Sequence, residues 1–501
     1  MRRRTARRPP PSREPAVTSA SSPASGRGPA SDRPARRVRG VDAVRGLAVL
    51  GMVAVHVGNP TAVDGSPSWE HLAFAGLASA VFVVVAGVSL ALHWPSPGSA
   101  GLPTTDPHPR RTARLLVRAG LLFLLGLLLG LLESPVAVIL CHYGVLFTLA
   151  PALLRLRVRT ALAAGVSWTL LGPVAVFALT TLGWSFLGRT AVSVDGRLWT
   201  SPAPADLLRP GVLLSDLLLT GYYPVLAWGG FLLLGIGLGR AVEAARDRGE
   251  LPRAAGRMLA AGAAAWGAGA AVWLALPRDE SLRARISAAT GVDLQTLRAT
   301  LLTGEHALVW LIPDPLWLAL AVPHGGGMGE AVRVAGAATA LLGLAVLLAD
   351  RTATVVPSAV ASGPLRERAS GRVPLRERAP GRVPLRERAS GRVPLRERAS
   401  GRVPLRVLTA PLETVGRIPL TLYVGHLMVL APLADAGLRG PSAFCADPGW
   451  CWNTDVAVLV AWAGCLAVAL AFRLCRSRGP LEAGLQAAAS AVVGKRGPGP
   501  R

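Results

Sequence analysis

Long apolar runs separated by short polar segments dominate the pattern of hydrophobic and polar positions along the chain. Runs of roughly 17 to 25 residues are long enough to cross a hydrocarbon core of about 30 Å as α-helices. Because a bilayer offers the backbone no hydrogen-bond partners, such runs favour helices over irregular structure. We therefore expect an all-α, polytopic integral membrane protein with about ten transmembrane helices. They lie near residues 41–57, 72–93, 112–132, 136–154, 160–182, 222–241, 256–276, 331–349, 412–434 and 454–472.

The positions of the arginines predict how the helices are oriented in the cell membrane. Short clusters, such as Arg240, Arg246 and Arg248, fall in loops that an alternating topology places in the cytoplasm. The outer loops 58–71 and 435–453 hold almost no arginine, as the positive-inside rule requires. Two long outer loops do contain arginine, but they also contain balancing acidic residues. An even number of helices then places both termini in the cytoplasm.

Segments of different composition divide the chain into domains. Residues 1–39 are rich in Arg, Pro and Ser, and we expect a disordered, basic cytoplasmic arm. The membrane domain comprises 40–350, with the first eight helices, and 406–475, with the last two. Between them, 351–405 are expected to form a cytoplasmic linker, because their tandem repeat, Pro-Leu-Arg-Glu-Arg-Ala-Ser-Gly-Arg-Val, is too polar to bury a core. Residues 476–501 form a cytoplasmic tail.

The net charge of +25 does not indicate a nucleic-acid-binding protein. The arginines lie in the arm, the short loops and the repeat, and no nucleic-acid-binding motif accompanies them. We expect membrane lipids as partners instead, and the repeat is a candidate for contact with anionic headgroups. The abundance of Ala, Gly, Pro and Leu suggests a GC-rich bacterial genome.

Two of the five cysteines lie close together in the last outer loop. Cys445 and Cys451 flank a Pro-Gly turn, and an outer loop is exposed to an oxidising environment, so a disulfide between them is expected. No further Cys or His accompanies them, which argues against a zinc site. We therefore expect no metal.

Arg45 and His56 form the most informative pair in the chain. They lie eleven residues apart in one apolar run, and eleven helical steps return almost to the same angle, about 16 Å further along. Asp42 precedes Arg45 by three residues, within reach of an intrahelical ion pair. Charged and titratable groups on one stripe of a membrane helix are costly and indicate a functional site. The alternative is that Arg45 snorkels to the interface and His56 marks the outer helix end.

This combination of residue types is suited to acyl transfer. The reaction needs a base with a pKa near neutrality beside the acceptor, and a cation that holds an anionic donor. Helical periodicity alone does not distinguish this chemistry from the transport of protons or a solute.

Three other histidines lie where they could contact a substrate. His142 and His426 fall inside predicted helices, where a hydrogen bond to a neighbouring helix is the alternative interpretation. His324 belongs to an outer segment, Pro-His-Gly-Gly-Gly, that can fold back towards the ends of the helices.

Several segments of the sequence, beginning with the one that contains Arg45 and His56, resemble a known family. The stretch 41–48, followed by His56, is similar to the first-helix signature of the transmembrane acyltransferase superfamily. Further segments, in the same order, resemble the bacterial relatives of heparan-α-glucosaminide N-acetyltransferase. They are 78–90, 143–147, 221–224, 235–240, 323–325 and 419–426.

The resemblance implies that cytosolic acyl-CoA, with acetyl-CoA as the expected donor, passes its acyl group through the helical core to an acceptor near the outer face. It implies that His56 is the catalytic histidine and that Arg45, with Asp42, forms the donor-side electrostatic element. This sequence differs from the lysosomal heparan-α-glucosaminide N-acetyltransferase. That enzyme has an asparagine at the position of His56, and its own active-site histidine would fall near Ser66.

We therefore expect an acyltransferase that modifies an envelope glycan or glycoside, with His324, His426 and His142 as substrate-binding residues. The alternative is a transporter or lipid-handling protein that kept the scaffold without acyl transfer. A third possibility is a noncatalytic membrane partner that acts through its repeat.

Overall fold

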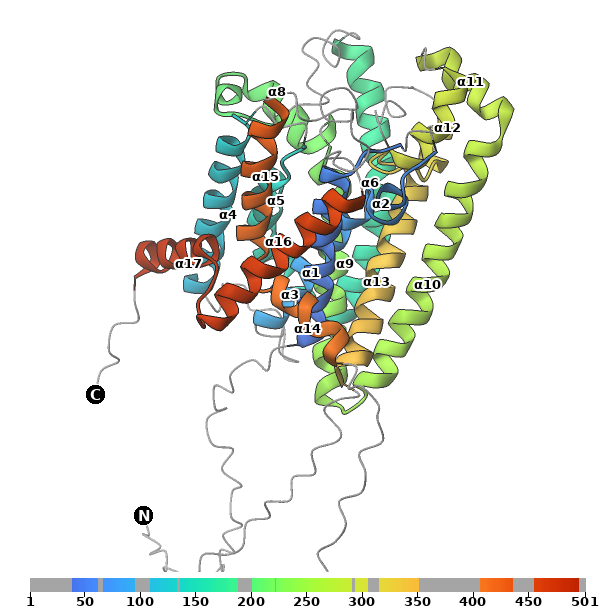
Figure 1. Cartoon of the computed structure of the whole chain (residues 1–501). Helices are drawn as coiled ribbons and strands as arrows, with labels where there is room; N and C mark the ends of the chain where they lie inside the picture. The colour runs from blue at the N-terminus through green and yellow to red at the C-terminus, as the bar shows by residue number, and fades with distance from the viewer. Residues whose placement is uncertain are drawn as a thin grey trace, which may run out of the picture. The chain divides into compact units, whose positions relative to one another are not determined.

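A computed structural model shows the arrangement of the membrane helices (Figure 1). The arm and the repeat, including 1–37 and 351–405, lie outside the described residues. The same holds for Cys445 and Cys451, so their disulfide remains a prediction. The residues that the structure describes are 38–61, 66–94, 109–132, 136–187, 201–220, 222–290, 293–304, 315–350, 406–435 and 455–494.

Every predicted transmembrane segment contains helix, and the described residues contain no strand. The all-α, polytopic class is therefore confirmed. The helices of the predicted spans, together with α17 at the C-terminal side, are α1 (Arg39–Val57), α3 (Leu77–His93), α4 (Pro109–Leu129), α5 (Leu140–Leu153), α6 (Val158–Leu187), α9 (Val225–Asp247), α10 (Leu251–Ala275), α13 (Met328–Asp350), α14 (Arg406–Val415), α15 (Pro419–Asp435), α16 (Asp455–Leu474) and α17 (Pro480–Val493). Short helices at loops include α2 (Trp69–Phe74), α8 (Pro210–Ser215), α11 (Glu280–Thr290) and α12 (Leu294–Thr303).

Two of the predicted spans differ from simple membrane helices. Among the described residues, eight helices are long and apolar enough to cross a bilayer, and α14 with α15 makes a ninth if this bent pair is counted as one span. The bent pair turns by 75°. The remaining predicted span, α5, has 14 residues and is about 21 Å long, which is short of the hydrocarbon thickness.

The bend between α14 and α15 follows from the local sequence and from a side chain of α17. Pro419 cannot continue the preceding helix because it lacks a backbone N–H. The new helix is capped by Glu482, whose carboxylate accepts hydrogen bonds from the backbone N–H groups of Leu420 at 2.8 Å and Thr421 at 3.1 Å. These two N–H groups have no partner within the first turn of α15, so the carboxylate satisfies donors that the helix leaves open.

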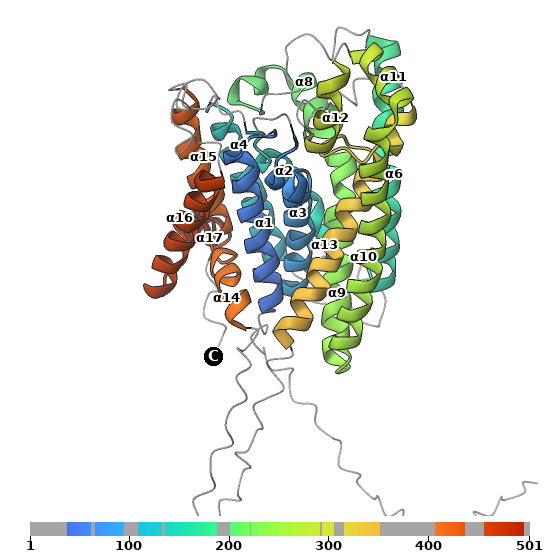
Figure 2. The ribbon, with the colours of Figure 1, turned by 45° about the vertical axis from the view of Figure 1, so that its right-hand side comes forward.

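Helices α1, α3 and α9 form the interior of the membrane domain. Most of each is buried, whereas most of α10 and α16 is not. Figure 2 shows α13 beside α10 and α14 beside α1, in agreement with the contacts between these pairs. Exposed Leu, Val and Trp side chains on the outer helices are where lipid is expected to lie.

One end of the bundle, which we call the basic end, is fixed by Arg240. The sequence predicts this arginine in a cytoplasmic loop, but it lies inside α9 and is 1% exposed. Its guanidinium donates hydrogen bonds to the backbone oxygen of Trp94, after α3, at 2.9 Å and to that of Leu154, after α5, at 3.0 Å. Carbonyls at helix C-termini lack intrahelical partners, so a cation is stabilising there. Arg240 thus joins α9 to the C-terminal ends of α3 and α5 at the basic end. The start of α1 also lies at this end, since Gly40 packs against Ala345 near the end of α13.

The closest helix contact in the site region joins α1 to α14. Gly46 packs against the backbone of Leu412, and Gly416 packs against the backbone of Asp42. In each case an added Cβ atom would collide with a backbone oxygen, which cannot move aside as a flexible side chain can. Small residues permit such close approach between membrane helices.

This contact predicts the effect of a single methyl group. Gly416→Ala should push α14 away from α1 and lower the free energy of unfolding by about 1–3 kcal/mol, as overpacking does. Thermal unfolding of the purified protein measures the effect. Gly425→Ala is the matched control, because nothing lies within 4 Å of a Cβ at that position on α15. Equal stability of the two variants would show that the α1–α14 contact is looser than described.

Candidate functional site

Arg45 joins three helices through its guanidinium. Nη1 lies 2.8 Å from Oδ1 of Asp42, so the expected ion pair within α1 is present. Nη1 also donates a hydrogen bond to the backbone oxygen of Gly416 at 3.0 Å, and Nη2 donates to Oγ of Ser89 on α3 at 2.5 Å. The side chain of Arg45 remains 18% exposed, while that of Asp42 is 9% exposed. The cation is therefore held by a carboxylate, a hydroxyl and a carbonyl, and part of it stays accessible.

Ser89 and Gly416 are partners that the sequence interpretation missed. The hydroxyl of Ser89 donates a hydrogen bond to the backbone oxygen of Val85 at 2.6 Å, which leaves its oxygen to accept a hydrogen bond from Arg45. Gly416 lies 371 residues from Arg45 along the chain, and no local pattern connects the two. Only the fold brings them together.

His56 lies beside His426 of α15. Nδ1 of His56 is 2.9 Å from Nε2 of His426, and the two rings are nearly parallel at 11°, with centroids 5.1 Å apart. Nδ1 of His426 is in turn 3.2 Å from the backbone oxygen of Leu422. Both side chains are half-buried. The structure thus pairs two of the predicted site residues that lie 370 residues apart.

The hydrogen-bond partners assign the proton positions in this pair. The carbonyl oxygen of Leu422 can only accept, so Nδ1 of His426 carries hydrogen. In neutral His426, Nε2 is then an acceptor, and His56 must donate from Nδ1. The acceptor nitrogen of neutral His56 is therefore Nε2. Such a chain orients an imidazole and sets its tautomer, as the partner of a catalytic base does.

The other two predicted substrate-binding histidines meet at a different residue, Tyr223. The ring centroid of His142 is 5.6 Å from that of Tyr223, and the centroid of His324 is 5.9 Å from it. His324 also lies 6.0 Å from the ring of Tyr222. Tyr222 and Tyr223 precede α9, which ends at the basic end, so this cluster lies towards the opposite, distal end of the bundle.

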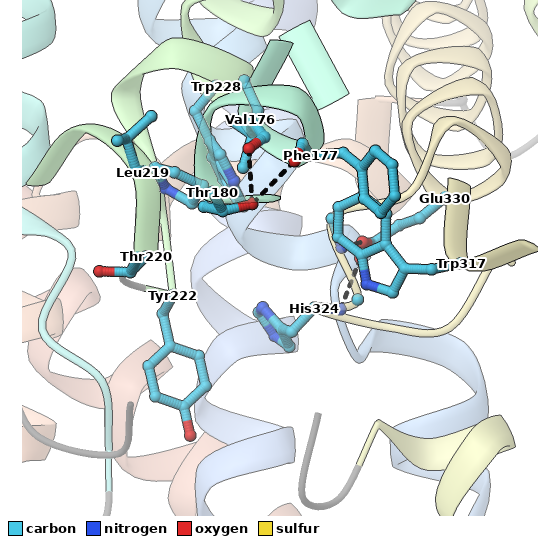
Figure 3. A pocket seen from close by; sticks show the side chains of 14 residues that line it. Val176, Phe177, Thr180, Leu219, Thr220, Tyr222, Trp228, Trp317, His324 and Glu330 are labelled. Atoms are coloured by element: carbon cyan, nitrogen blue, oxygen red, sulfur yellow. Dashed lines mark hydrogen bonds between the residues drawn. The ribbon is translucent and has the colours of Figure 1, made fainter. Parts of the chain in front are cut away.

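A small hollow, open to solvent on one side, lies beside His324 (Figure 3). It lies between the later part of α6, the segment before α9 and the loop 315–327. Its larger side chains are mostly aromatic: Phe177, Tyr222, Trp228, Trp317, His324 and Glu330. A concave, largely apolar site with a few polar groups is the usual form of a small-molecule site.

Glu330 fixes the loop that carries His324. Its carboxylate accepts hydrogen bonds from the backbone N–H of His324 at 2.6 Å and from that of Gly326 at 2.8 Å. Both residues have positive φ, 57° for His324 and 70° for Gly326. A histidine in the left-handed region is strained, and such strain persists only where surrounding contacts enforce it.

The environment of His324 makes it a weak base. Burial, together with the nearby positive charge of Arg333, lowers the pKa of His324 from 6.5 to about 4. The imidazole is therefore uncharged at neutral pH, and it is a weaker base than an ordinary histidine. This suits a residue that binds a substrate by hydrogen bonds better than one that removes its proton.

Among the described residues, no three His, Cys, Asp or Glu side chains gather as a metal ion would require. The predicted site residues instead fall into three groups: Arg45 with Asp42, His56 with His426, and His142 with His324 around Tyr223.

Comparison with protein families identifies residues 37–274 as matching the family described as heparan-alpha-glucosaminide N-acetyltransferase, catalytic. The matched region runs from α1 into α10 and contains Asp42, Arg45, His56 and His142. His324 and His426 lie beyond it. Comparisons with curated proteins and with solved structures give no match. Through residues 37–274, this multi-pass membrane protein is similar to the family of heparan-alpha-glucosaminide N-acetyltransferase catalytic domains, which are membrane N-acetyltransferases.

Proposed function

We propose that this protein transfers an acyl group, in the first place acetyl, from cytosolic acyl-CoA to an envelope glycan or glycoside. The observation that carries the proposal is the hydrogen-bond chain from His56 through His426 to the carbonyl of Leu422. This chain of hydrogen bonds orients a base on α1. Helix α1 lies within residues 37–274, which match a family of N-acetyltransferases. Acetyl-CoA is the donor expected from the family.

In the proposed reaction, His56 is the general base. Nε2 of His56 takes the proton from the amine or hydroxyl of the acceptor as that group attacks the thioester carbonyl carbon. A new bond forms from the acceptor to the acyl carbon, the carbon–sulfur bond breaks, and the thiolate of CoA leaves. The imidazolium returns the proton to the thiolate, so that CoA is released as the thiol and His56 is restored.

His426 is proposed to position His56 and stabilise its charged form. When His56 gains a proton, its Nδ1–H becomes a stronger donor to Nε2 of His426. The bond from His426 to Leu422 holds the acceptor nitrogen of His426 in place for this role. His426 therefore acts through His56 and need not contact the substrate.

Arg45 is proposed to serve the donor side. It lies on the same helix as His56, about 16 Å nearer the basic end. CoA is anionic, and a cation that is 18% exposed at that side favours its approach. By the positive-inside rule we assign the basic end to the cytoplasm. Both termini and the linker 351–405 would then be cytoplasmic, and 40–350 with 406–475 would form the membrane domain.

The acceptor is proposed to enter from the distal end, where His324 and the hollow lie. His142 joins this side through its contact with Tyr223. Donor and acceptor would thus reach His56 from opposite ends of the bundle, which is the arrangement that transfer across a membrane requires.

Substitutions at the histidine pair test these roles. His56→Ala should lower kcat by about 10²–10⁴-fold, the usual contribution of a general base. His426→Leu should lower kcat by a smaller factor with little change in KM, because it removes the orienting acceptor only. His426→Gln should recover part of the loss, since its amide oxygen can accept the proton of His56 Nδ1. Acyl transfer from labelled acetyl-CoA in membranes measures all three, and undiminished activity of His56→Ala would refute the assignment.

Arg45→Lys tests whether the site needs the planar guanidinium group, with its several hydrogen-bond donors, or only a positive charge. A lysine keeps the charge but cannot reach Asp42, Ser89 and Gly416 together, so activity should fall more than about tenfold and the thermal midpoint should drop. Arg159→Lys, at an exposed position in the first turn of α6, is the matched control. Binding of acetyl-CoA to the purified protein is measured in parallel. Wild-type activity and stability of Arg45→Lys would refute the need for the guanidinium, whereas the absence of acetyl-CoA binding to the wild-type protein would favour the transporter alternative.

A further inference from the structure

Two residues that line the hollow at the distal end each carry a polar atom with no hydrogen-bond partner among the described residues. Trp317 is 5% exposed, and its indole Nε1 is buried without a hydrogen-bond acceptor. Nδ1 of His324 is likewise buried without a partner. Buried polar groups are nearly always hydrogen-bonded in folded proteins, so two such atoms on residues that line one hollow indicate a ligand with polar groups of its own.

The surrounding rings provide flat apolar faces next to these atoms. Trp317 stacks on Phe177 with centroids 5.6 Å apart and planes inclined by 27°. Trp228 stands edge-on to Tyr223 at 4.9 Å. Figure 3 shows the ring of His324 directed into the space between Tyr222 and Trp228. Rigid aromatic walls with a few polar atoms select a ligand that is apolar on its face and polar at its edge.

The wall of the hollow is fixed in advance. Both oxygens of Glu330 are engaged by the backbone N–H groups of His324 and Gly326, so this carboxylate holds the loop and keeps His324 in place. A site with fixed polar groups discriminates strongly between ligands that do and do not satisfy them.

The hollow is not the site of proton transfer proposed above. That role belongs to His56, which is paired with His426, whereas His324 meets Tyr222 and Tyr223. Burial and the charge of Arg333 also lower the pKa of His324, which makes it a weaker base than an ordinary histidine. The hollow therefore suits a part of the acceptor that does not react.

We propose that the hollow around Trp317 and His324 is a subsite for a pyranose ring of the acceptor glycan, separate from the ring that receives the acyl group. The apolar face of the sugar would lie on an aromatic wall, and its hydroxyl groups would accept from the indole N–H of Trp317 and bond to Nδ1 of His324. This proposal rests on the proposed function. It adds that the acceptor extends beyond one sugar unit.

The test compares two probes that differ by one ring, in the absence of acyl donor. Methyl glucosaminide and the methyl glycoside of a 1,4-linked glucosamine disaccharide are titrated into the full-length protein in nanodiscs, and binding is measured by calorimetry. The disaccharide should bind at least about tenfold more tightly, because only it fills the subsite. Trp317→Phe, which keeps a ring but loses the N–H, should weaken disaccharide binding about three- to tenfold, the value of one hydrogen bond. Trp317→Ala should weaken it further.

Trp266→Phe is the matched control, because Trp266 is 48% exposed on α10 and lies away from the hollow. It should bind the disaccharide as the wild type does. Equal affinity for the two probes, no saturable binding of either at millimolar concentration, or equal loss for both probes in Trp317→Phe would overturn the subsite. Acyl transfer is assayed separately, so disaccharide binding through Trp317 without any transfer would refute the proposed function and leave the subsite standing.

Discussion

The bonds of Arg45 are the interaction on which the site depends. A cation inside a membrane bundle is costly unless it meets partners, and Arg45 meets Asp42, Ser89 and the carbonyl of Gly416. These partners lie on α1, α3 and at the end of α14, so the same bonds that stabilise the charge also hold three helices in register. The absence of a side chain at Gly416 lets its backbone come close enough to accept.

The position of His426 follows from this arrangement. The chain leaves Gly416 and turns by 75°, and α15 then starts with its first N–H groups bound to Glu482 of α17. His426 lies two turns into α15, where its ring reaches His56. Tyr423, one turn earlier, contacts the same imidazole at 5.3 Å and accepts a hydrogen bond from the backbone N–H of Ile139 before α5. Arg45 and the histidine pair are thus parts of one packed unit.

Local sequence patterns were sufficient to predict the helices, but they could not predict contacts between segments that are distant in the sequence. Apolar runs located the long helices of the described residues, and the eleven-residue spacing placed Arg45 and His56 on one stripe. The ion pair with Asp42 followed from its spacing of three. The pairing of His56 with His426 could not be predicted, because it depends on the bend and the crossing of α1 with α14. Arg240 was misplaced in a loop for a similar reason: hydropathy cannot show that helix C-termini converge on it.

In the proposed reaction, an acyl group moves from CoA at the basic end of the bundle to an acceptor at the distal end. Sealed inside-out vesicles test this transfer, with labelled acetyl-CoA outside and a glucosaminide acceptor trapped within. Labelled acceptor should form inside the vesicles, with free CoA accumulating outside. Product that forms only when donor and acceptor share the same compartment, or no product in vesicles shown to contain the protein, would contradict it.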